Sequence, residues 1–359
     1  MPFQIIRNDI TRVKADAIVN TANPVPVIGS GTDSAIYSAA GEKLLLAERK
    51  KIGNIVPGRA AVTPAFGLNA EYIIHTVGPV WIDGKHKEHD ILRSCYANSL
   101  SLAKKLSCNS IAFPLIATGV YGFPKDEALQ IALSEINRFL LKNDMKVILV
   151  VFDKKSFELS GKLTDNINEY IDENTARDLR KEEYELFDFD SILLSKWRSE
   201  RSEFSDKNAD LVDTDLSHEK TDEVKAAGLP SLPDMSGKSL DEILESAEDT
   251  FQQRLFRLID ERGLDEVSVY KKANIDRKLF SRIRSKQDYK PQKKTAVAFA
   301  IALELDMPAM LDLLSRAGIA FSPGNKFDLI IAYFVNNNNY DIFEINAALF
   351  KYGQPILGE

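Results

Sequence analysis

Cysteine and long apolar runs are scarce in this chain. Its two cysteines, Cys95 and Cys108, are too few for a disulfide framework or a thiolate metal site, and they suit a reducing compartment. The longest apolar runs, such as residues 147–152, fall far short of a membrane span. The first residues show neither the basic segment nor the apolar core of a secretion signal. We therefore expect a cytoplasmic protein with no membrane partner and with neither a metal nor a cofactor.

An excess of acidic residues is confined to one part of the chain. The formal net charge is −7, yet residues 1–199 carry equal numbers of acidic and basic side chains. Residues 200–249 hold 15 acidic and 5 basic side chains, and residues 251–359 hold 16 basic and 13 acidic ones. Such an uneven distribution indicates segments with different tasks. The length of 359 residues is consistent with two domains and a linker.

Short apolar runs alternate with helical patterns over residues 1–174. The expected strands are Gln4–Arg7, Ala17–Val19, Tyr72–Val77, Ser110–Pro114 and Lys146–Val151. The expected helices are Ser34–Lys50, His89–Leu106, Lys125–Asn143 and Phe157–Ile171. This alternation predicts an α/β fold of three α/β/α layers, with a mixed, mostly parallel sheet covered on both faces. Ligand loops of such folds lie at the carboxyl ends of the strands.

The rest of the chain divides into a polar and a helical part. Residues 175–200 are expected to form a charged helical extension, and residues 201–249 an acidic linker too poor in apolar side chains to fold. A short helix is expected over Leu240–Glu248. Residues 250–359 predict a separate all-α domain. Its expected helices are Phe251–Arg262, Val267–Asn274, Arg277–Ser285, Lys293–Leu305, Met307–Ala317, Lys326–Val335 and Ile342–Phe350.

The most informative string runs from Ile18 to Gly41. A short apolar strand leads into Asn20 and Asn23, a glycine loop follows, and Asp33 stands at the start of a helix of small residues. Glycine lets the backbone approach a ligand, and a helix N-terminus offers free N–H groups to an anion. Two amides and a carboxylate beside such a loop can position a sugar and a water molecule.

A second glycine loop covers Ala117–Phe123 and reads ATGVYGF. Gly119 and Gly122 free the backbone to wrap a diphosphate with N–H donors. Thr118 can add a hydroxyl donor.

These strings resemble the ligand loops of macrodomains, the ADP-ribose-binding modules, and in particular the MacroD-type (Appr-1-p processing) branch. The resemblance extends from Phe3 to Leu163. Its further motifs are NDIT at 8–11, IIHTVGP at 73–79, IAFPLIATGVYGFP at 111–124 and VVFDKKSF at 150–157. The resemblance implies a protein that binds ADP-ribose or ADP-ribosylated protein.

The resemblance also implies a role for individual residues. Asp33 and Asn23 would be catalytic, with Asn23 on the distal ribose and Asp33 on the attacking water. Asp9 would contact the adenine amine, with a turn cap before Thr11 as the alternative. Phe152 would stack on adenine, with core packing as the alternative. The full set of ligand-binding residues would be Asp9, Ile10, Asn20, Gly31, Thr32, Thr118, Gly119, Val120, Tyr121, Gly122, Phe123 and Phe152. For Asn20 the alternative is a structural role that shapes the first loop.

The implied activity is metal-free hydrolysis of ADP-ribosyl esters, on protein or on O-acetyl-ADP-ribose. The first loop departs from the family pattern. Ser30 and Thr32 interrupt its glycine run, Ser34 follows the aspartate, and Tyr37 replaces a histidine. Each added side chain stiffens or fills the loop. The alternative is therefore a non-catalytic reader or a transcriptional regulator that senses ADP-ribose.

Residues 267–305 resemble the Xre/λ-repressor-like helix-turn-helix. Residues 267–295 hold ten basic and two acidic side chains, a composition that can hold phosphates. The resemblance implies DNA contacts from the second helix. The predicted nucleic-acid-binding residues are Arg277, Lys278, Ser281, Arg282, Arg284 and Lys286. A protein-interaction module is the alternative, and the last two apolar helices can form a homodimer interface.

Overall fold

The computed structural model describes residues 2–152, 157–174 and 249–358. The expected helical extension, the linker before residue 249 and the helix over Leu240–Glu248 lie outside these residues. Met1–Ile171 and Asp249–Glu359 form one compact unit. No helix of the described residues is both long and apolar enough to cross a membrane.

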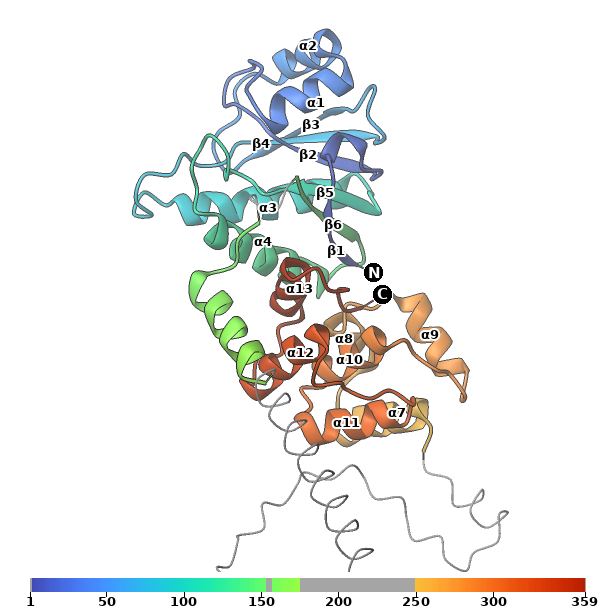
Figure 1. Cartoon of the computed structure of the whole chain (residues 1–359). Helices are drawn as coiled ribbons and strands as arrows, with labels where there is room; N and C mark the ends of the chain where they lie inside the picture. The colour runs from blue at the N-terminus through green and yellow to red at the C-terminus, as the bar shows by residue number, and fades with distance from the viewer. Residues whose placement is uncertain (1, 153–156, 175–248, 359) are drawn as a thin grey trace, which may run out of the picture. The chain divides into compact units, whose positions relative to one another are not determined.

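Six strands form one sheet in the described chain (Figure 1). They are β1 (Phe3–Arg7), β2 (Ala17–Thr21), β3 (Ala60–Pro64), β4 (Tyr72–Thr76), β5 (Ser110–Pro114) and β6 (Lys146–Val151). Their order is β1-β6-β5-β2-β4-β3, and every pair is parallel except β3 with β4. The five expected strands are confirmed. Strand β3 was not predicted, because only Thr63 of its five residues is buried and no apolar run marks it.

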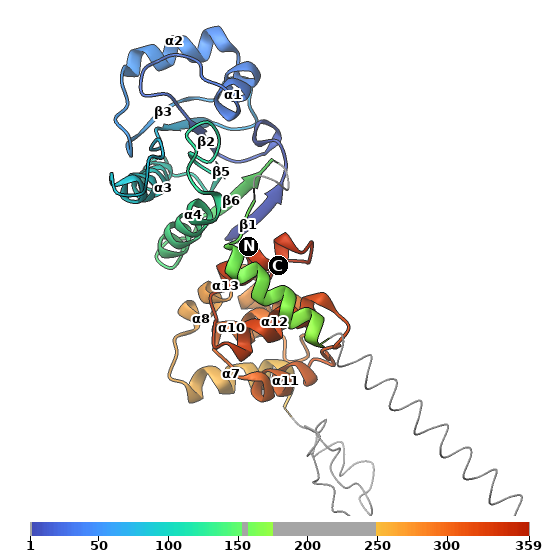
Figure 2. The same ribbon diagram turned by 60° about the vertical axis from the view of Figure 1, so that its left-hand side comes forward.

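Helices cover both faces of the sheet (Figure 2). Helices α1 (Thr32–Ala40) and α2 (Glu42–Ile52) lie on one face, and α3 (Glu88–Lys105) and α4 (Lys125–Leu140) on the other. The three-layer prediction is confirmed, but the single helix expected over Ser34–Lys50 is wrong. Gly41, at a φ of 99°, ends α1 and begins α2, a backbone conformation that favours glycine. The helix expected from Phe157 begins only at residue 161 and runs to residue 174.

Neighbouring residues of each central strand enter different cores. Ile18, Ile73 and Ile148 pack with α1 and α2, whereas Val19, Ile74 and Leu149 face α3 and α4. Because side chains alternate along a strand, a sheet buried on both faces reads as a continuous apolar run.

Residues 250–358 form the helical region, which we define as α7 to α13. These helices are α7 (Phe251–Glu261), α8 (Glu266–Lys272), α9 (Arg277–Ser285), α10 (Lys293–Ala302), α11 (Met307–Ser315), α12 (Lys326–Asn336) and α13 (Ile342–Lys351). All seven expected helices are confirmed. Asp, Asn or Thr caps six of their N-termini, which explains why the sequence located them. Residues 295–302 of α10 are all buried, so this helix is the centre of the region.

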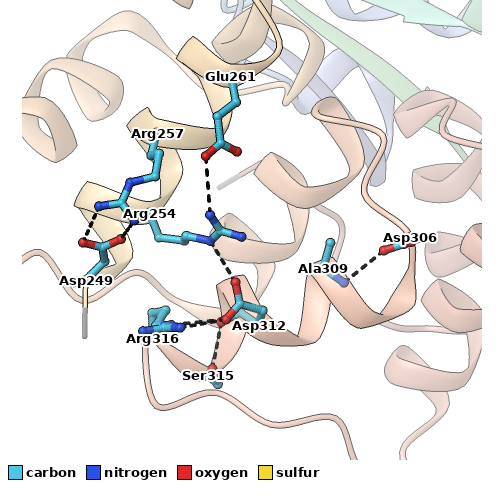
Figure 3. A network of polar contacts seen from close by, with 9 residues as sticks. All are labelled: Asp249, Arg254, Arg257, Glu261, Asp306, Ala309, Asp312, Ser315 and Arg316. Atoms are coloured by element: carbon cyan, nitrogen blue, oxygen red, sulfur yellow. Dashed lines mark hydrogen bonds and ion pairs between the residues drawn. The ribbon is translucent and has the colours of Figure 1, made fainter. Parts of the chain in front are cut away.

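Ion pairs add to apolar packing between α7 and α11 (Figure 3). Arg254 on α7 donates from Nε to Asp312 Oδ2 on α11 at 2.8 Å. Arg316 reaches the other carboxylate oxygen of Asp312 at 2.9 Å. Arg316 lies four residues after Asp312 at the end of the same helix, so it holds the carboxylate in place, and the ion pair of Arg254 is the one that joins α7 to α11.

A buried asparagine joins the helical region to the sheet. Asn274, in the turn between α8 and α9, has a φ of 54° and is 1% exposed. Its Oδ1 accepts the N–H of Phe3 at 2.9 Å, and its Nδ2 donates to the carbonyl of Phe3 at 3.1 Å and to that of Leu357 at 3.3 Å. The amide thus pairs with the edge strand β1 as a further strand would. The ring centroids of Phe3 and Phe343 of α13 lie 4.8 Å apart, and both rings belong to one apolar cluster that the two regions share. The predicted domain boundaries stay a prediction.

We predict that Asn274→Gly lowers the free energy of unfolding by about 2 kcal/mol, since it strips buried backbone groups of their partner. Glycine tolerates the positive φ, so the change tests the amide alone. Urea unfolding gives the value, and Asn337→Gly, which removes an exposed bond to the Tyr333 carbonyl, is the matched control. Equal losses in both variants would contradict the role given to Asn274.

Candidate functional site

One cavity of about 610 Å³ opens at the carboxyl ends of β1, β2, β5 and β6. This volume lies in the range of about 300–1,000 Å³ that small-molecule sites occupy. Most of the residues predicted to bind or act on a ligand line it. They are Asp9, Ile10, Asn23, Gly31, Thr32, Asp33, Thr118, Gly119, Val120, Tyr121 and Phe152.

Three predicted ligand residues do not line the cavity. Each of them instead stabilises the strand or loop around it. Asn20 is completely buried below it. Phe123 is 2% exposed and packs edge-on against Trp81, with ring centroids 4.7 Å apart. Gly122 turns the second loop at a φ of 68°, and its N–H bonds the carbonyl of Gly119. For Asn20 this agrees with the structural alternative, whereas the sequence could not separate Gly122 and Phe123 from their neighbours in the second loop.

The carboxylate of Asp33 is 3% exposed and both of its oxygens are engaged. Oδ1 accepts from Asn20 Nδ2 and Oδ2 accepts from the N–H of Gly29, each at 2.6 Å. Burial raises the pKa of Asp33, and the two hydrogen bonds and the charge of Arg49 offset only part of this effect. Asp33 therefore shapes the first loop as well as lining the cavity.

Asn20 extends this contact into the sheet. Its Nδ2 lies 3.1 Å from His75 Nδ1, and His75 Nε2 lies 3.0 Å from Thr63 Oγ1. Burial, followed by the charge of Arg49, lowers the pKa of His75 to about 3, so the ring is neutral at physiological pH. The chain from Asp33 to Thr63 thus crosses β2, β4 and β3 without adding a second charge.

Arg49 is a functional residue that sequence reasoning missed. It is 1% exposed, and its guanidinium donates to the carbonyls of Asn23 at 3.1 Å, Pro24 at 3.2 Å and Gly53. It thereby fastens α2 to the first loop. One signal was present: Arg49 follows Leu45 by four residues and so shares the buried face of its helix.

Backbone N–H groups provide donors on two sides of the cavity. In the second loop, the N–H groups of residues 118–121 have no hydrogen-bond partner among the described residues. In the first loop, Gly31 precedes α1 at a φ of 62° and brings no capping side chain, which leaves the helix N-terminus open. The hydroxyl of Thr118 donates to the carbonyl of Leu115 at 3.0 Å, so the expected hydroxyl donor is already engaged. Such opposed N–H groups suit a phosphate or diphosphate.

The far end of the cavity carries Asp9 and Phe152. Asp9 Oδ1 accepts from the N–H and the hydroxyl of Thr11, at 2.9 and 2.7 Å, so the turn cap is present. Oδ2 of Asp9 has no partner within the described residues. Phe152 is 71% exposed, so the core-packing alternative is wrong for it. An unpaired acceptor and a bare aromatic ring suit a base with an exocyclic amine.

The two loops meet above Asp33. The hydroxyl of Tyr121 lies 3.5 Å from Asn23 Oδ1, and Asn23 Nδ2 donates to the carbonyl of Val27 at 3.2 Å. A Cβ at Gly29 would lie 2.8 Å from Asn23 Nδ2 and 3.1 Å from Asp33 Oδ2, so a larger residue there would displace the two side chains that face the cavity.

The six residues predicted to bind nucleic acid are all exposed, on α9 or directly after it. Arg284 pairs with Glu266 at 2.7 Å. Arg277 and Lys278 line a second hollow of about 390 Å³, which they share with the end of α4 and the start of β6.

We predict that Arg49→Met lowers the free energy of unfolding by about 3 kcal/mol, because three loop carbonyls lose a buried donor. Chemical denaturation measures the loss. Lys51→Met, on the same helix but 69% exposed, should change stability by less than about 0.5 kcal/mol. A loss for Arg49→Met as small as that of the control would show that the guanidinium does not hold the loop.

Comparison with known proteins identifies the sheet region. A family model described as Macro domain matches residues 19–132. A macro domain-containing protein of Methanosarcina mazei is 46% identical over 156 residues, which cover 43% of this chain and 83% of that protein. An O-acetyl-ADP-ribose deacetylase of Citrobacter rodentium is 43% identical over 166 residues, covering 45% of this chain and 94% of the relative. The solved structure of the Oceanobacillus iheyensis macrodomain with ADP is 39% identical, covers 42% of this chain and 84% of that one, and superposes with a TM-score of 0.41. With almost half of its residues matching nearly whole relatives at this identity, the chain belongs to the macro domain family.

Proposed function

We propose that this protein binds ADP-ribose in the 610 Å³ cavity and hydrolyses ADP-ribosyl esters there. The observation that carries the proposal is the pair of opposed N–H donor groups, in residues 118–121 and at the start of α1. Both border one cavity that ends in an aromatic ring on one side and a buried carboxylate on the other. ADP-ribose matches this arrangement. Its charged diphosphate lies in the middle, its adenine at one end and its second ribose at the other.

The residues lining the cavity support one orientation of the ligand. Adenine would lie on Phe152 with its amine on Asp9 Oδ2, and the diphosphate would accept from the second loop and from α1. The distal ribose would then reach Asn23 and Asp33. Relatives named O-acetyl-ADP-ribose deacetylase match the same region, which supports an ester substrate.

The proposed chemistry is attack by water on the ester. The carboxylate of Asp33 keeps lone pairs beyond those used by Asn20 and Gly29, so it can also accept from a water molecule. A carboxylate that orients or deprotonates the water favours its attack, and the products are the free acid and ADP-ribose. The raised pKa of Asp33 makes it a better base than an exposed aspartate.

The departures from the family pattern fall in different places. Ser30 and Thr32 line the cavity, so their side chains occupy space beside the first loop that glycine would leave open. Tyr37 is 1% exposed and lies inside the core that contains Ile36 and Leu45, so it takes no space from the ligand. Ser34 does not line the cavity, and its hydroxyl donates to the carbonyl of Gly31 at 3.0 Å. Ser30 and Thr32 are therefore the departures that border the ligand directly.

The first test combines calorimetry with a turnover assay. We expect micromolar binding of ADP-ribose and release of acetate from O-acetyl-ADP-ribose. Asp33→Asn should slow release by about 100-fold or more while changing the affinity by less than about tenfold, because the base is lost and the loop keeps one acceptor. Asp90→Asn, an exposed acid in the first turn of α3, is the matched control.

The other outcomes separate the alternatives. Binding without release in the unmodified protein would favour the non-catalytic reader. Parallel loss of binding and turnover in Asp33→Asn would assign Asp33 to loop shape alone. Failure of the unmodified protein to bind ADP-ribose would overturn the proposal.

We also propose that α9 and the loop after it bind nucleic acid. The observation in its favour is a group of exposed cations without an ion-pair partner among the described residues, namely Arg277, Lys278, Arg282, Lys286 and Lys290. Unpaired cations hold phosphates by counterion release.

For this surface we predict that the double variant Arg282→Gln with Lys286→Gln weakens binding to duplex DNA by about tenfold and flattens its salt dependence. Fluorescence anisotropy at two salt concentrations measures both effects. Lys14→Gln with Lys104→Gln, two cations of the sheet region, is the control for net charge. An equal loss in both pairs, or no DNA binding at all, would count against the proposal.

A further inference from the structure

Exposed apolar side chains gather around one end of the cavity. Among described residues 2–152, nine large apolar side chains are more than 40% exposed, and six of them stand on four neighbouring loops. We name these six the apolar rim: Val25, Val27, Val56, Val80, Ile82 and Val120. Their exposed fractions run from 46% for Val25 to 85% for Val120. A contiguous exposed apolar surface of this kind marks an interaction site in a folded protein.

Hydrogen bonds show that the four loops are neighbours. The N–H of Ile55 donates to the carbonyl of Pro24 at 2.9 Å, which places Val56 beside Val25. The N–H of Trp81 donates to the carbonyl of Tyr121 at 2.8 Å, which places Val80 and Ile82 beside Val120. The Tyr121 hydroxyl then reaches Asn23 at 3.5 Å and joins the two pairs of loops. The rim is therefore one surface.

This surface borders the end of the cavity that holds Asp33. Val25 and Val27 lie between Asn23 and Gly29, which both line the cavity, and Val120 lines it as well. Phe152, where adenine is proposed to lie, ends a different strand. A group attached to the distal ribose would leave the cavity across the rim.

The rim carries no charge of either sign. Residues 22–31, 53–58, 77–82 and 115–124, which contain its six members, include no Lys, Arg, Asp or Glu. The charges that border these loops are single residues at their ends, namely Arg59, Asp83 and Lys125. A nucleic acid chain needs several cations to neutralise its phosphates, and the rim offers it none. An apolar protein surface is the partner that this composition fits.

We infer that the apolar rim docks the protein that carries the ADP-ribose, through apolar side chains next to the modified residue. The inference rests on the proposed binding of ADP-ribose and adds to it the class of acceptor: proteins with apolar residues flanking the modification, in preference to nucleic acid ends or charged segments.

The test uses peptides that carry ADP-ribose through a hydrolysis-resistant oxime, so that turnover does not interfere. One peptide has leucines beside the modified position and its pair has lysines there. The full-length protein should bind the leucine peptide about tenfold more tightly than free ADP-ribose, and the lysine peptide no more tightly than free ADP-ribose.

The rim is then altered by the triple change Val27→Ser, Val56→Ser and Ile82→Ser, none of which lines the cavity. We expect this variant to lose the preference for the leucine peptide and to bind free ADP-ribose within about twofold of the unmodified protein. The control is Leu44→Ser with Leu141→Ser, which removes two exposed leucines outside the rim, at 59% and 45% exposure. It should keep the preference.

The outcomes distinguish this inference from the function on which it rests. No binding of free ADP-ribose would overturn both. Normal binding of ADP-ribose with equal affinity for the two peptides would overturn the rim alone. A preference for an ADP-ribosylated oligonucleotide, or self-association of the protein that the triple change abolishes, would assign the surface to another occupant and overturn the inference as well.

Discussion

The buried carboxylate of Asp33 is the contact on which the arrangement of the site depends. Its two oxygens hold the N–H of Gly29 and the amide of Asn20, so the first loop, the start of α1 and the end of β2 meet at one charge. Burying a carboxylate is costly unless hydrogen bonds satisfy it. The surrounding residues meet this requirement through Asn20, neutral His75 and the positive charge of Arg49. These hydrogen bonds hold the Asp33 side chain in one position, and this position fixes the first loop along the wall of the cavity.

Arg49 and Asn274 likewise stabilise buried groups, in two other parts of the structure. Each is a buried polar side chain whose donors or acceptor satisfy backbone groups that no strand or helix reaches. Arg49 holds the loop carbonyls beside the cavity, and Asn274 holds the outer edge of β1 against the helical region. Irregular backbone can be buried only where such partners exist. Buried hydrogen bonds therefore extend from the sheet into the loop beside the cavity and into the helical region.

How far the sequence predicted this structure depended on whether the signal was local. Apolar runs located five strands, and Asp, Asn or Thr caps mark six of the seven C-terminal helices. Strand β3 was not predicted because it lies at the edge of the sheet and only one of its residues, Thr63, is buried. Gly41 divided a helical pattern that looked continuous, since a glycine in a helix pattern can be either an interior residue or a stop. Arg49 was overlooked because a basic residue on a helix is most often exposed.

The sequence by itself determined the elements and the residue types at the strand ends, since apolar period, glycine and capping residues act through local backbone preferences. Eleven of the fourteen predicted ligand and catalytic residues line one cavity, at strand ends, in loops or at the start of α1. Only the tertiary structure decided which side chains meet Asn20 inside β2, because its partners Asp33 and His75 come from α1 and β4. These elements lie beside β2 only when the fold has formed. The same reason governs the apolar rim, whose six members come from four loops far apart in the chain and become one surface only when the sheet has formed.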